Sequence, residues 1–370
     1  MPTIRILVVD DSVVIRKLLC DTLSKDPELE VIATAGDGRI ALAKIAQLRP
    51  DLVTLDIEMP VMNGLETLAE IRKSDPKLPV IMFSTLTERG AAITLDALSA
   101  GASDYATKPS NTGNPGAAFE AIQTELIPKI KALCPATSAR LKTQIPVRPA
   151  VPARPRLRQP VEIVAIGTST GGPNALAEVL PRIPQDFPVP IVVVQHMPPI
   201  FTHLLAERLA KQSKISVAEG RAGVTLTAGQ AWIAPGNFHM TVARAGMQWR
   251  LELNQEPPRH SCRPAVDVLF HSVAGAYRAN VLGVVMTGMG GDGVRGAHQI
   301  REAGGEIIIQ DEASAVVWGM PGLVYAAGQA DGVYPLEQLA SEITRRVQQS
   351  RLPRTASTSN QLAASESRSR

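Results

Sequence analysis

In the first third of the chain, short apolar runs alternate with longer segments whose apolar residues recur at helical spacing. The strand-like runs cover residues 4–9, 30–33, 52–56, 80–83 and 104–107. The helix-like segments cover residues 13–23, 39–48, 65–74, 91–99 and 118–133. Five repeats of this kind predict a doubly wound parallel α/β sheet with helices on both faces.

The same alternation resumes near residue 161 and predicts a second α/β domain. Its clear strand-like runs cover residues 161–166, 191–194, 231–234, 281–286 and 306–309. Its helical segments cover residues 174–180, 201–211, 266–277, 294–303 and 336–349. Consecutive strand and helix signals again favour a parallel, Rossmann-like sheet.

Between the two blocks the periodicity disappears. Prolines alternate with arginines across residues 139–159, a composition that cannot bury a core and predicts a semi-rigid, polyproline-like linker. A docking segment for an acidic partner is the alternative interpretation. Residues 353–370 are rich in Ser, Arg and Ala and predict a disordered tail. The predicted domains are therefore residues 4–125, with a last helix to about 134, and residues 160–352.

Composition narrows the function without fixing it. The 370 residues are 45% hydrophobic and 20% charged, as in soluble globular domains. A net charge of only +3 argues against nucleic acid as a partner. The three cysteines form no CxxC pair, so neither a disulfide framework nor a zinc site is expected. With no apolar run long enough to span a bilayer and no signal peptide pattern, a cytoplasmic protein without membrane insertion is expected.

Acidic residues gather at strand ends in the first block. Asp10 and Asp11 follow the first strand-like run, and Asp56 ends the third. Parallel strands share one carboxyl edge, where these repelling carboxylates would require a hard cation such as Mg²⁺. Ser84 follows the fourth run and Lys108 the fifth. Each residue alone could be a helix cap or a solvated charge, but the set predicts a phosphoryl-acceptor site.

Asp10, Asp11, Asp56 and Lys108 stand in runs that resemble two-component response-regulator receiver domains. The runs are residues 8–12 (VVDDS), 56–64 (DIEMPVMNG) and 108–109 (KP). The resemblance implies a flavodoxin-like (βα)5 receiver phosphorylated on Asp56 by a histidine kinase. It also implies Mg²⁺ ligation by Asp10, Asp11 and Asp56, with Ser84, Tyr105 and Lys108 as the switch residues.

A glycine-rich loop opens the second domain. Residues 167–171 (GTSTG) fit the G-x-S-x-G pattern, in which small residues allow a sharp turn from strand to helix. Ser169 would then lie at a helix N-terminus, where backbone N–H groups can stabilise an oxyanion, and Pro173 suits the first helical position. A phosphate-binding loop and a plain tight turn remain open for this segment, although a P-loop lysine and the dinucleotide glycine spacing are absent from the sequence.

A histidine and an aspartate in the second domain favour the hydrolase interpretation. Of the six histidines, only His196 directly follows a clear parallel-type strand. Asp292 follows another strand and is surrounded by glycines. In a triad, His196 would take the proton from Ser169, and Asp292 would orient the histidine. The chain order Ser, His, Asp differs from the Ser, acid, His order of α/β-hydrolases. The remaining histidines are expected to pack, to lie on the surface or to fall in irregular sequence: His203, His239, His260, His271 and His298.

Three motifs together resemble the family of chemotaxis response-regulator protein-glutamate methylesterases. They are residues 166–173 (IGTSTGGP), 195–198 (QHMP) and 286–293 (MTGMGGDG). The resemblance implies that a C-terminal esterase domain, joined to the receiver by the Pro/Arg-rich linker, uses Ser169, His196 and Asp292, with Thr170 and Met289 near the oxyanion. The family more commonly has Ala at the position of Thr168 and Asn at that of Gly291, and neither difference removes a reacting group.

The resemblance also sets the expected reaction. It implies phosphorylation-activated hydrolysis of glutamate γ-methyl esters, with release of methanol, and deamidation of glutamines. The substrates would be methyl-accepting chemotaxis receptors, the esterase step would need no cofactor, and the protein would be a monomer. The alternative function is a response regulator whose output domain binds a nucleotide or nucleic acid without catalysis.

Overall fold

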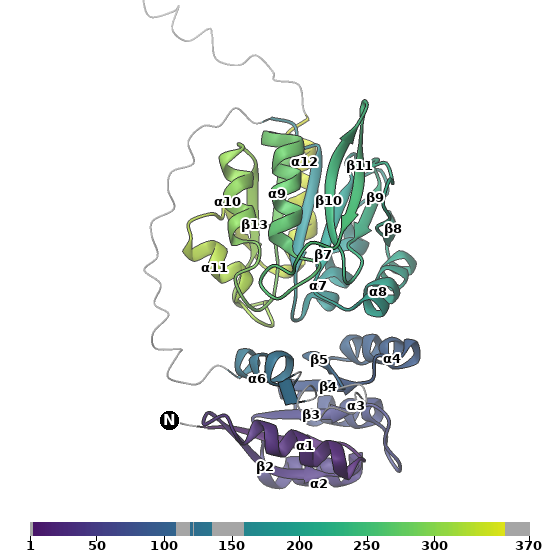
Figure 1. The fold of residues 1–370 in the computed structure, drawn as a ribbon, viewed down its shortest axis with the longest axis vertical. Helices are drawn as coiled ribbons and strands as arrows, with labels where there is room; N and C mark the ends of the chain where they lie inside the picture. The colour runs from purple at the N-terminus through teal and green to yellow at the C-terminus, as the bar shows by residue number, and fades with distance from the viewer. Residues whose placement is uncertain (1–2, 109–118, 121, 135–158, 352–370) are drawn as a thin grey trace, which may run out of the picture.

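The computed structural model describes residues 3–108, 119–120, 122–134 and 159–351. The chain forms two α/β units, the first shown in purple to blue and the second in teal to yellow in Figure 1. Nearly all of the predicted linker and the whole predicted tail lie outside the described residues. Within these residues, no helix has the length and apolar character needed to cross a membrane.

The first unit is a five-stranded parallel sheet in the order β2-β1-β3-β4-β5, which is the flavodoxin-like order. The strands are β1 (Ile4–Val9), β2 (Leu29–Ala35), β3 (Leu52–Asp56), β4 (Val80–Ser84) and β5 (Asp104–Thr107). The helices are α1 (Val13–Leu23), α2 (Gly38–Leu48), α3 (Gly64–Ser74), α4 (Glu88–Ser99) and α6 (Ile127–Leu133). A side-chain cap begins each of the first four helices: Ser12, Asp37, Asn63 and Thr87.

The last helix of this unit differs from the uniform helix predicted for residues 118–133. A π-helical turn covers Ile122–Leu126 before α6 begins. Pro128 stands in the first turn of α6 and cannot donate a backbone N–H. A proline at this position explains why regular α-helical bonding gives way to a wider turn just before it.

The second unit is a seven-stranded parallel sheet in the order β14-β13-β12-β6-β7-β9-β8. Its strands are β6 (Ile163–Thr168), β7 (Ile191–Gln195), β8 (Ser216–Glu219), β9 (Gln230–Ile233), β12 (Val281–Val285), β13 (Glu306–Gln310) and β14 (Gly332–Tyr334). Its main helices are α7 (Gly172–Val179), α8 (Pro199–Gln212), α9 (Val266–Tyr277), α10 (Val294–Glu302), α11 (Met320–Ala326) and α12 (Leu336–Gln349). The central strands β6, β7 and β12 are buried throughout, as their continuous apolar runs predict.

A separate antiparallel hairpin, β10 (His239–Ala245) with β11 (Gln248–Asn254), was not predicted. Its apolar residues alternate with polar ones, most clearly along β11, so it has no continuous apolar run in the sequence. The prediction that His239 lies in irregular sequence is wrong, because this residue opens β10 and is fully buried. The short edge strands β8 and β14 and the seven-residue helix α11 also lack a pattern long enough to predict them.

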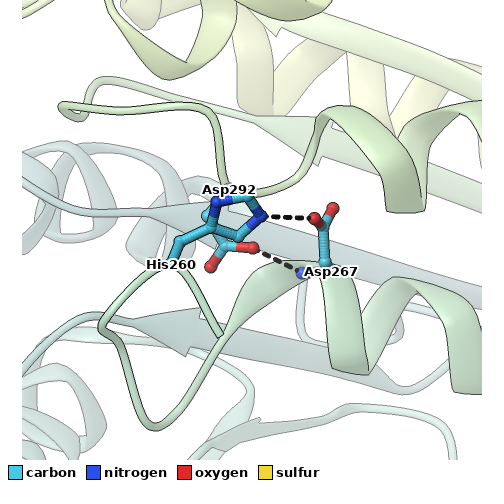
Figure 2. Close-up of side chains that lie close together, drawn as sticks. All are labelled: His260, Asp267 and Asp292. Atoms are coloured by element: carbon cyan, nitrogen blue, oxygen red, sulfur yellow. Dashed lines mark hydrogen bonds and ion pairs between the residues drawn. The ribbon is translucent and has the colours of Figure 1, made fainter. Parts of the chain in front are cut away.

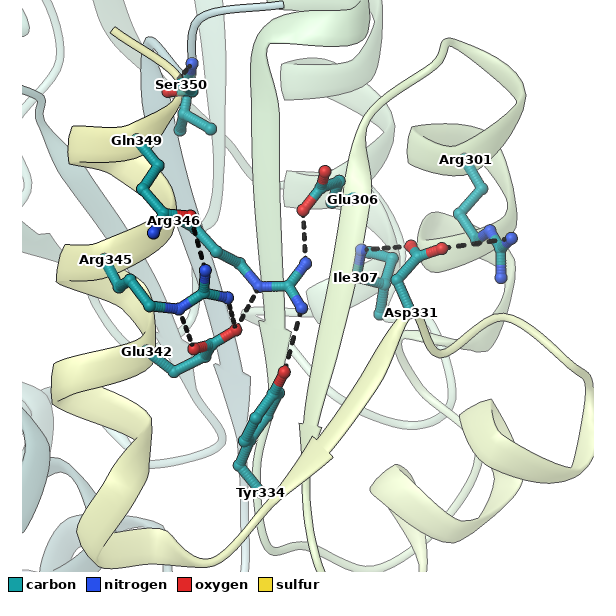
Figure 3. Close-up of polar contacts among 11 residues, drawn as sticks. Arg301, Glu306, Ile307, Asp331, Tyr334, Glu342, Arg345, Arg346, Gln349 and Ser350 are labelled. Atoms are coloured by element: carbon teal, nitrogen blue, oxygen red, sulfur yellow. Dashed lines mark hydrogen bonds and ion pairs between the residues drawn. The ribbon is translucent and has the colours of Figure 1, made fainter. Parts of the chain in front are cut away.

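The C-terminal helix α12 is tied to the edge of the second sheet by a polar network (Figure 3). Glu342 accepts hydrogen bonds of 2.6 Å from Arg345 and from Arg346. Arg346 also pairs with Glu306 of β13 and donates to the Tyr334 hydroxyl of β14 at 3.1 Å. This network holds the last helix against the β13-β14 edge of the sheet.

Candidate active site

The predicted acidic cluster forms at the carboxyl edge of the first sheet. Asp10 follows β1, Asp56 ends β3, and both side chains are buried, whereas Asp11 is exposed. One carboxylate oxygen from each of the three residues lies within 4.8 Å of the others. Lys108, directly after β5, places its Nζ 2.9 Å from Asp10 Oδ2 and 2.8 Å from Asp56 Oδ2.

The charges of this cluster favour a bound cation. Burial raises the pKa of Asp56 to about 6, although the hydrogen bond from Lys108 acts in the opposite direction. Among the described residues, Lys108 is the only side-chain cation paired with these carboxylates. Three carboxylates against one ammonium group make an oxygen-rich site that is short of positive charge, which fits Mg²⁺.

The remaining predicted switch residues lie on neighbouring strands. Ser84 ends β4, is buried, and donates its hydroxyl to the backbone carbonyl of Gly90 at 3.2 Å. Tyr105 of β5 is buried and reaches the second unit. Its ring stacks on Phe201 of α8 with a centroid distance of 4.6 Å and an interplanar angle of 11°. Tyr105 therefore connects the first sheet physically to the second unit.

In the second unit, the three predicted catalytic residues follow three adjacent strands. Ser169 follows β6, His196 follows β7, and the turn that carries Asp292 follows β12, in the sheet order β12-β6-β7. The turns are bonded to one another. Ser169 N donates to Thr287 O at 3.0 Å, and His196 N donates to Thr168 O at 3.3 Å. The three turns thus form one continuous surface at the carboxyl edge of the sheet.

The turn at Ser169 is made by its glycine neighbours. Gly171 adopts a φ of 76° and caps α7, so the left-handed residue of the turn is this glycine. Gly172 begins the helix and Pro173 is its second residue, one position later than predicted. A Cβ on Gly288 would lie 2.8 Å from the Cβ of Ser169, so only glycine allows the β12 turn to pack this closely on the serine.

His196 and Asp292 form a buried pair. His196 Nε2 lies 2.8 Å from Asp292 Oδ2, and the two side chains are 11% and 2% exposed. Burial acts to raise the pKa of Asp292, but the bonds from His196 and from the backbone N–H groups of Asp267 and Val266 win, so this pKa is lowered. Asp292 therefore stays ionised beside the imidazole ring.

The pKa of His196 reflects the same balance seen from the other side. Burial alone lowers it, but the hydrogen bond with Asp292 and the nearby Cys262 sulfur raise it, and the net direction is upward. Nε2 faces Asp292, so Nδ1 is the ring nitrogen left for a serine hydroxyl, and the Cys262 sulfur lies beside the same ring. Among the described residues no hydrogen bond joins Ser169 to His196 in this conformation, so the turns rather than a direct bond bring them together.

The two residues predicted near the oxyanion flank the serine. Thr170 is buried, and its carbonyl accepts a 2.9 Å hydrogen bond from the Thr287 hydroxyl. Met289 is half-buried in the turn after β12, next to Gly288. The backbone of both residues belongs to the two turns that meet at Ser169.

The first unit covers this edge of the second sheet. In Figure 1, α4 and β5 face α7 and α8, and α4 packs against both helices. The Thr170 hydroxyl donates to Asp104 Oδ2 of β5 at 2.9 Å, and both residues are buried. Asn174 Nδ2 donates to Leu98 O at 2.7 Å. The residue directly after the predicted nucleophile is therefore bonded to the first unit and withdrawn from solvent.

Comparisons with known proteins identify both units. The family model described as CheB methylesterase matches residues 164–343, and the one described as response regulator receiver domain matches residues 6–118. A protein-glutamate methylesterase/protein-glutamine glutaminase of Trichodesmium erythraeum is 52% identical over 353 residues, which are 94% of this chain and 100% of the relative. One of Nocardioides sp. is 51% identical over 95% of this chain and 97% of the relative.

This chain belongs to the protein-glutamate methylesterase/protein-glutamine glutaminase family. The resemblance expected from the sequence motifs is thereby confirmed, as is the pair of parallel α/β domains. Two crystal structures from Thermotoga maritima are similar to parts of the chain. The CheB methylesterase catalytic domain is 39% identical and covers 50% of this chain and 98% of its own, with a TM-score of 0.49. The response regulator domain of CheB is 46% identical and covers 35% of this chain and 94% of its own, with a TM-score of 0.31.

Some residues at the methylesterase site were not singled out from the sequence. Gln195, the last residue of β7, is buried and donates to Ser169 O at 3.0 Å, which ties the serine turn to the histidine turn. Asp104 and Asp267 were also missed. The available signal was a polar residue that ends a buried strand for Gln195 and an acidic residue that begins one for Asp104. Asp267 stands in the first turn of a helix, after an alanine that cannot cap it.

Proposed function

We propose that this member of the methylesterase family hydrolyses glutamate γ-methyl esters and deamidates glutamines on methyl-accepting chemotaxis receptors. The observation that carries the proposal is the buried His196–Asp292 pair, 2.8 Å apart, on turns adjacent to the turn of Ser169. The names of the similar proteins support a hydrolase over the nucleotide-binding alternative.

The proposed reaction proceeds through an acyl-enzyme. The Ser169 hydroxyl attacks the ester carbonyl carbon while His196 takes its proton, and Asp292 stabilises the resulting imidazolium. The tetrahedral intermediate then expels the methoxy group, which leaves as methanol with the proton from His196. Water attacks the glutamyl–Ser169 ester with His196 again as base, which releases the glutamate carboxylate and regenerates the serine. A glutamine substrate follows the same path and releases ammonia.

Backbone donors near Thr170 and Met289 would hold the negative oxygen of the tetrahedral intermediate. The N-terminal end of α7 adds its positive dipole at the same place. Removal of one such donor costs about 10²–10³ in rate in comparable sites.

The receiver would control this site. Asp56 would accept a phosphoryl group from a chemotaxis histidine kinase, and Asp10, Asp11 and Asp56 would hold Mg²⁺, which neutralises charge during phosphoryl transfer. Phosphorylation would make residue 56 more negative and add acceptor oxygens, toward which Lys108, 2.8 Å from Asp56, and Ser84 would be drawn. Asp104 and Tyr105 belong to β5, the strand that ends directly before Lys108, and they would carry the change to the domain contact.

In this proposal, residues 4–125 form the receiver and residues 160–352 form the catalytic domain. Under the same proposal the protein acts in the cytoplasm as a monomer, with no nucleic-acid partner and no membrane insertion.

The contact between the receiver and the catalytic domain would be the element that phosphorylation changes. A change of this contact from mostly closed to mostly open requires about 5 kcal/mol of differential stabilisation.

Substitution of the nucleophile tests the reaction. Ser169→Ala removes the attacking oxygen, so methanol release from methylated receptors should fall by about 10⁴-fold or more. Ser213→Ala is the matched control, because Ser213 caps the far end of α8 and should leave the rate within twofold. A Ser169→Ala rate within tenfold of wild type would rule out the proposed nucleophile.

A further inference from the structure

Two helices, α9 and α10, begin next to Asp292 in the folded protein, and neither has a side-chain cap from its own N-cap residue. Ala265 precedes α9 and Gly293 precedes α10, and neither carries a side-chain oxygen that could accept a backbone N–H. Val266 at the start of α9 and Gly293 and Gly296 at the start of α10 are buried, so their N–H groups need acceptors from elsewhere in the protein.

Two aspartates supply these acceptors, each at the start of the other helix. Asp292, just before α10, accepts from the N–H groups of Val266 and Asp267 in α9 at 2.6 and 2.8 Å. Asp267, in the first turn of α9, accepts from the N–H groups of Gly293 and Gly296 at 2.9 and 2.7 Å. Each helix is thus capped by an aspartate from the start of the other.

A histidine completes the cluster (Figure 2). His260 Nε2 lies 2.9 Å from Asp267 Oδ2, the carboxylate oxygen that the backbone donors do not use. These three side chains lie close enough together to resemble a metal site. Every carboxylate oxygen of Asp267 and Asp292 nevertheless already has a protein donor, so the contacts are explained by capping without a cation.

We propose that Asp267 is a positioning residue that fixes Asp292 for its contact with His196, an inference that rests on the proposed function. Asp292 stands in a turn with glycines on both sides, so its backbone is not restrained by its neighbours. The bond from Gly293 N to Asp267 Oδ1 anchors the residue directly after Asp292. His260 holds the other oxygen of Asp267, so the carboxylate cannot rotate away.

Asp267→Ala should release the turn and displace the carboxylate of Asp292. Displacement of a catalytic group by about 1 Å costs on the order of 10²-fold in rate, so kcat should fall by that factor. Asp267→Asn keeps a carbonyl oxygen for Gly293 and Gly296, and kcat should stay within about tenfold of wild type. Asp331→Ala is the control, because Asp331 also accepts a 2.8 Å backbone bond in this domain, from Ile307 N. Asp331 directly precedes β14, which three strands separate from β7, the strand before His196.

The pH profile separates positioning from a general loss of folded protein. Asp292 raises the pKa of His196, so a displaced Asp292 lets this pKa fall. The rise of kcat/KM with pH should therefore move to lower pH in Asp267→Ala and stay in place in Asp331→Ala. An unmoved profile, or a kcat within twofold of wild type, would overturn the proposal.

Two further readouts keep the test decisive. The proton shared by His196 and Asp292 gives a downfield NMR signal that needs no substrate, and it should shift or broaden in Asp267→Ala. If the wild-type protein shows no Ser169-dependent methanol release, the proposed function fails, while an unchanged NMR signal makes the positioning role fail separately. If Asp267→Ala does not fold, His260→Ala at the surface should lower kcat by about threefold or more and shift the same signal, and no change would overturn the proposal.

Discussion

His196 lies between two influences of opposite sign. Burial disfavours its charged form, but the ionised Asp292 at 2.8 Å favours it, and the second influence wins. A raised pKa helps the step in which His196 protonates the leaving group and hinders the step in which it takes the serine proton. The reaction should therefore speed up as pH rises and the neutral imidazole becomes more abundant.

Asp292→Asn tests this balance. Asparagine has no negative charge, so the pKa of His196 should fall and the rise of kcat/KM should move to lower pH, by one pH unit or more. The maximal rate should fall by about 10³–10⁴, because the imidazolium loses its stabilising carboxylate. The measurement is methanol release across the pH range. An unchanged midpoint would show that Asp292 does not set the pKa of His196.

Ser169, His196 and Asp292 could be predicted from the sequence because each lies in a turn that follows an apolar, strand-like run. Asp267 could not be recognised in this way. Its partners are backbone N–H groups of a turn more than twenty residues away, and backbone groups leave no mark in a sequence. The environment of His196 also includes Cys262, which no motif in the sequence singles out.

Ion pairs hold helix α12 against the edge of the second sheet. Glu342 is only 9% exposed and lies between Arg345 and Arg346 (Figure 3). Burial acts to raise its pKa, but the two arginines overcome burial and lower it to about 2. The folded-state pKa is therefore below the unfolded value, so Glu342 stabilises the fold above about pH 4.5, and this stabilisation is lost as pH falls toward 2.

Glu342→Gln removes that charge. The free energy of unfolding at pH 7 should fall by about 2 kcal/mol, because Arg345 and Arg346 lose their shared partner. The acid sensitivity between pH 4.5 and 2 should also become weaker. Urea unfolding at several pH values measures both effects, with the exposed Glu337→Gln as control. Equal losses at pH 7 and pH 2.5 would contradict the account.

Long amphipathic helices followed their sequence pattern closely. Residues 13–23, 266–277 and 336–349 were predicted with the bounds that the structure shows. The hairpin of β10 and β11 was missed because its apolar residues alternate with polar ones, so no continuous apolar run marks it.

The contact between the two domains combines a buried hydrogen bond with an aromatic stack. The Thr170 hydroxyl donates to Asp104, and Tyr105 stacks on Phe201, so two consecutive residues of β5 bind the edge of the catalytic domain. Lys129 of α6 supports this pair, with Nζ 2.5 Å from Tyr105 O and 3.7 Å from Asp104 Oδ2. No repeat or spacing in the sequence predicts such a contact, because its residues come from separate domains.

Asp104→Ala should loosen the contact. Loss of one buried hydrogen bond to a charged acceptor, worth about 1.5–3 kcal/mol, should raise methanol release by the unphosphorylated protein several-fold. Asp96→Ala is the matched control, because the Asp96–Arg208 ion pair lies at the exposed rim and contributes little. An Asp104→Ala rate no higher than that of Asp96→Ala would show that the Thr170 bond does not restrain the enzyme.

The ratio of methanol release with and without a small-molecule phosphodonor, measured on methylated receptor membranes, tests the gated esterase most directly. The wild-type protein should show a ratio well above one, because phosphorylated Asp56 weakens the contact that covers Ser169. Asp56→Ala should show a ratio of one. Stimulation of Asp56→Ala equal to that of the wild type, or no stimulation of either protein, would contradict control of the active site by this receiver.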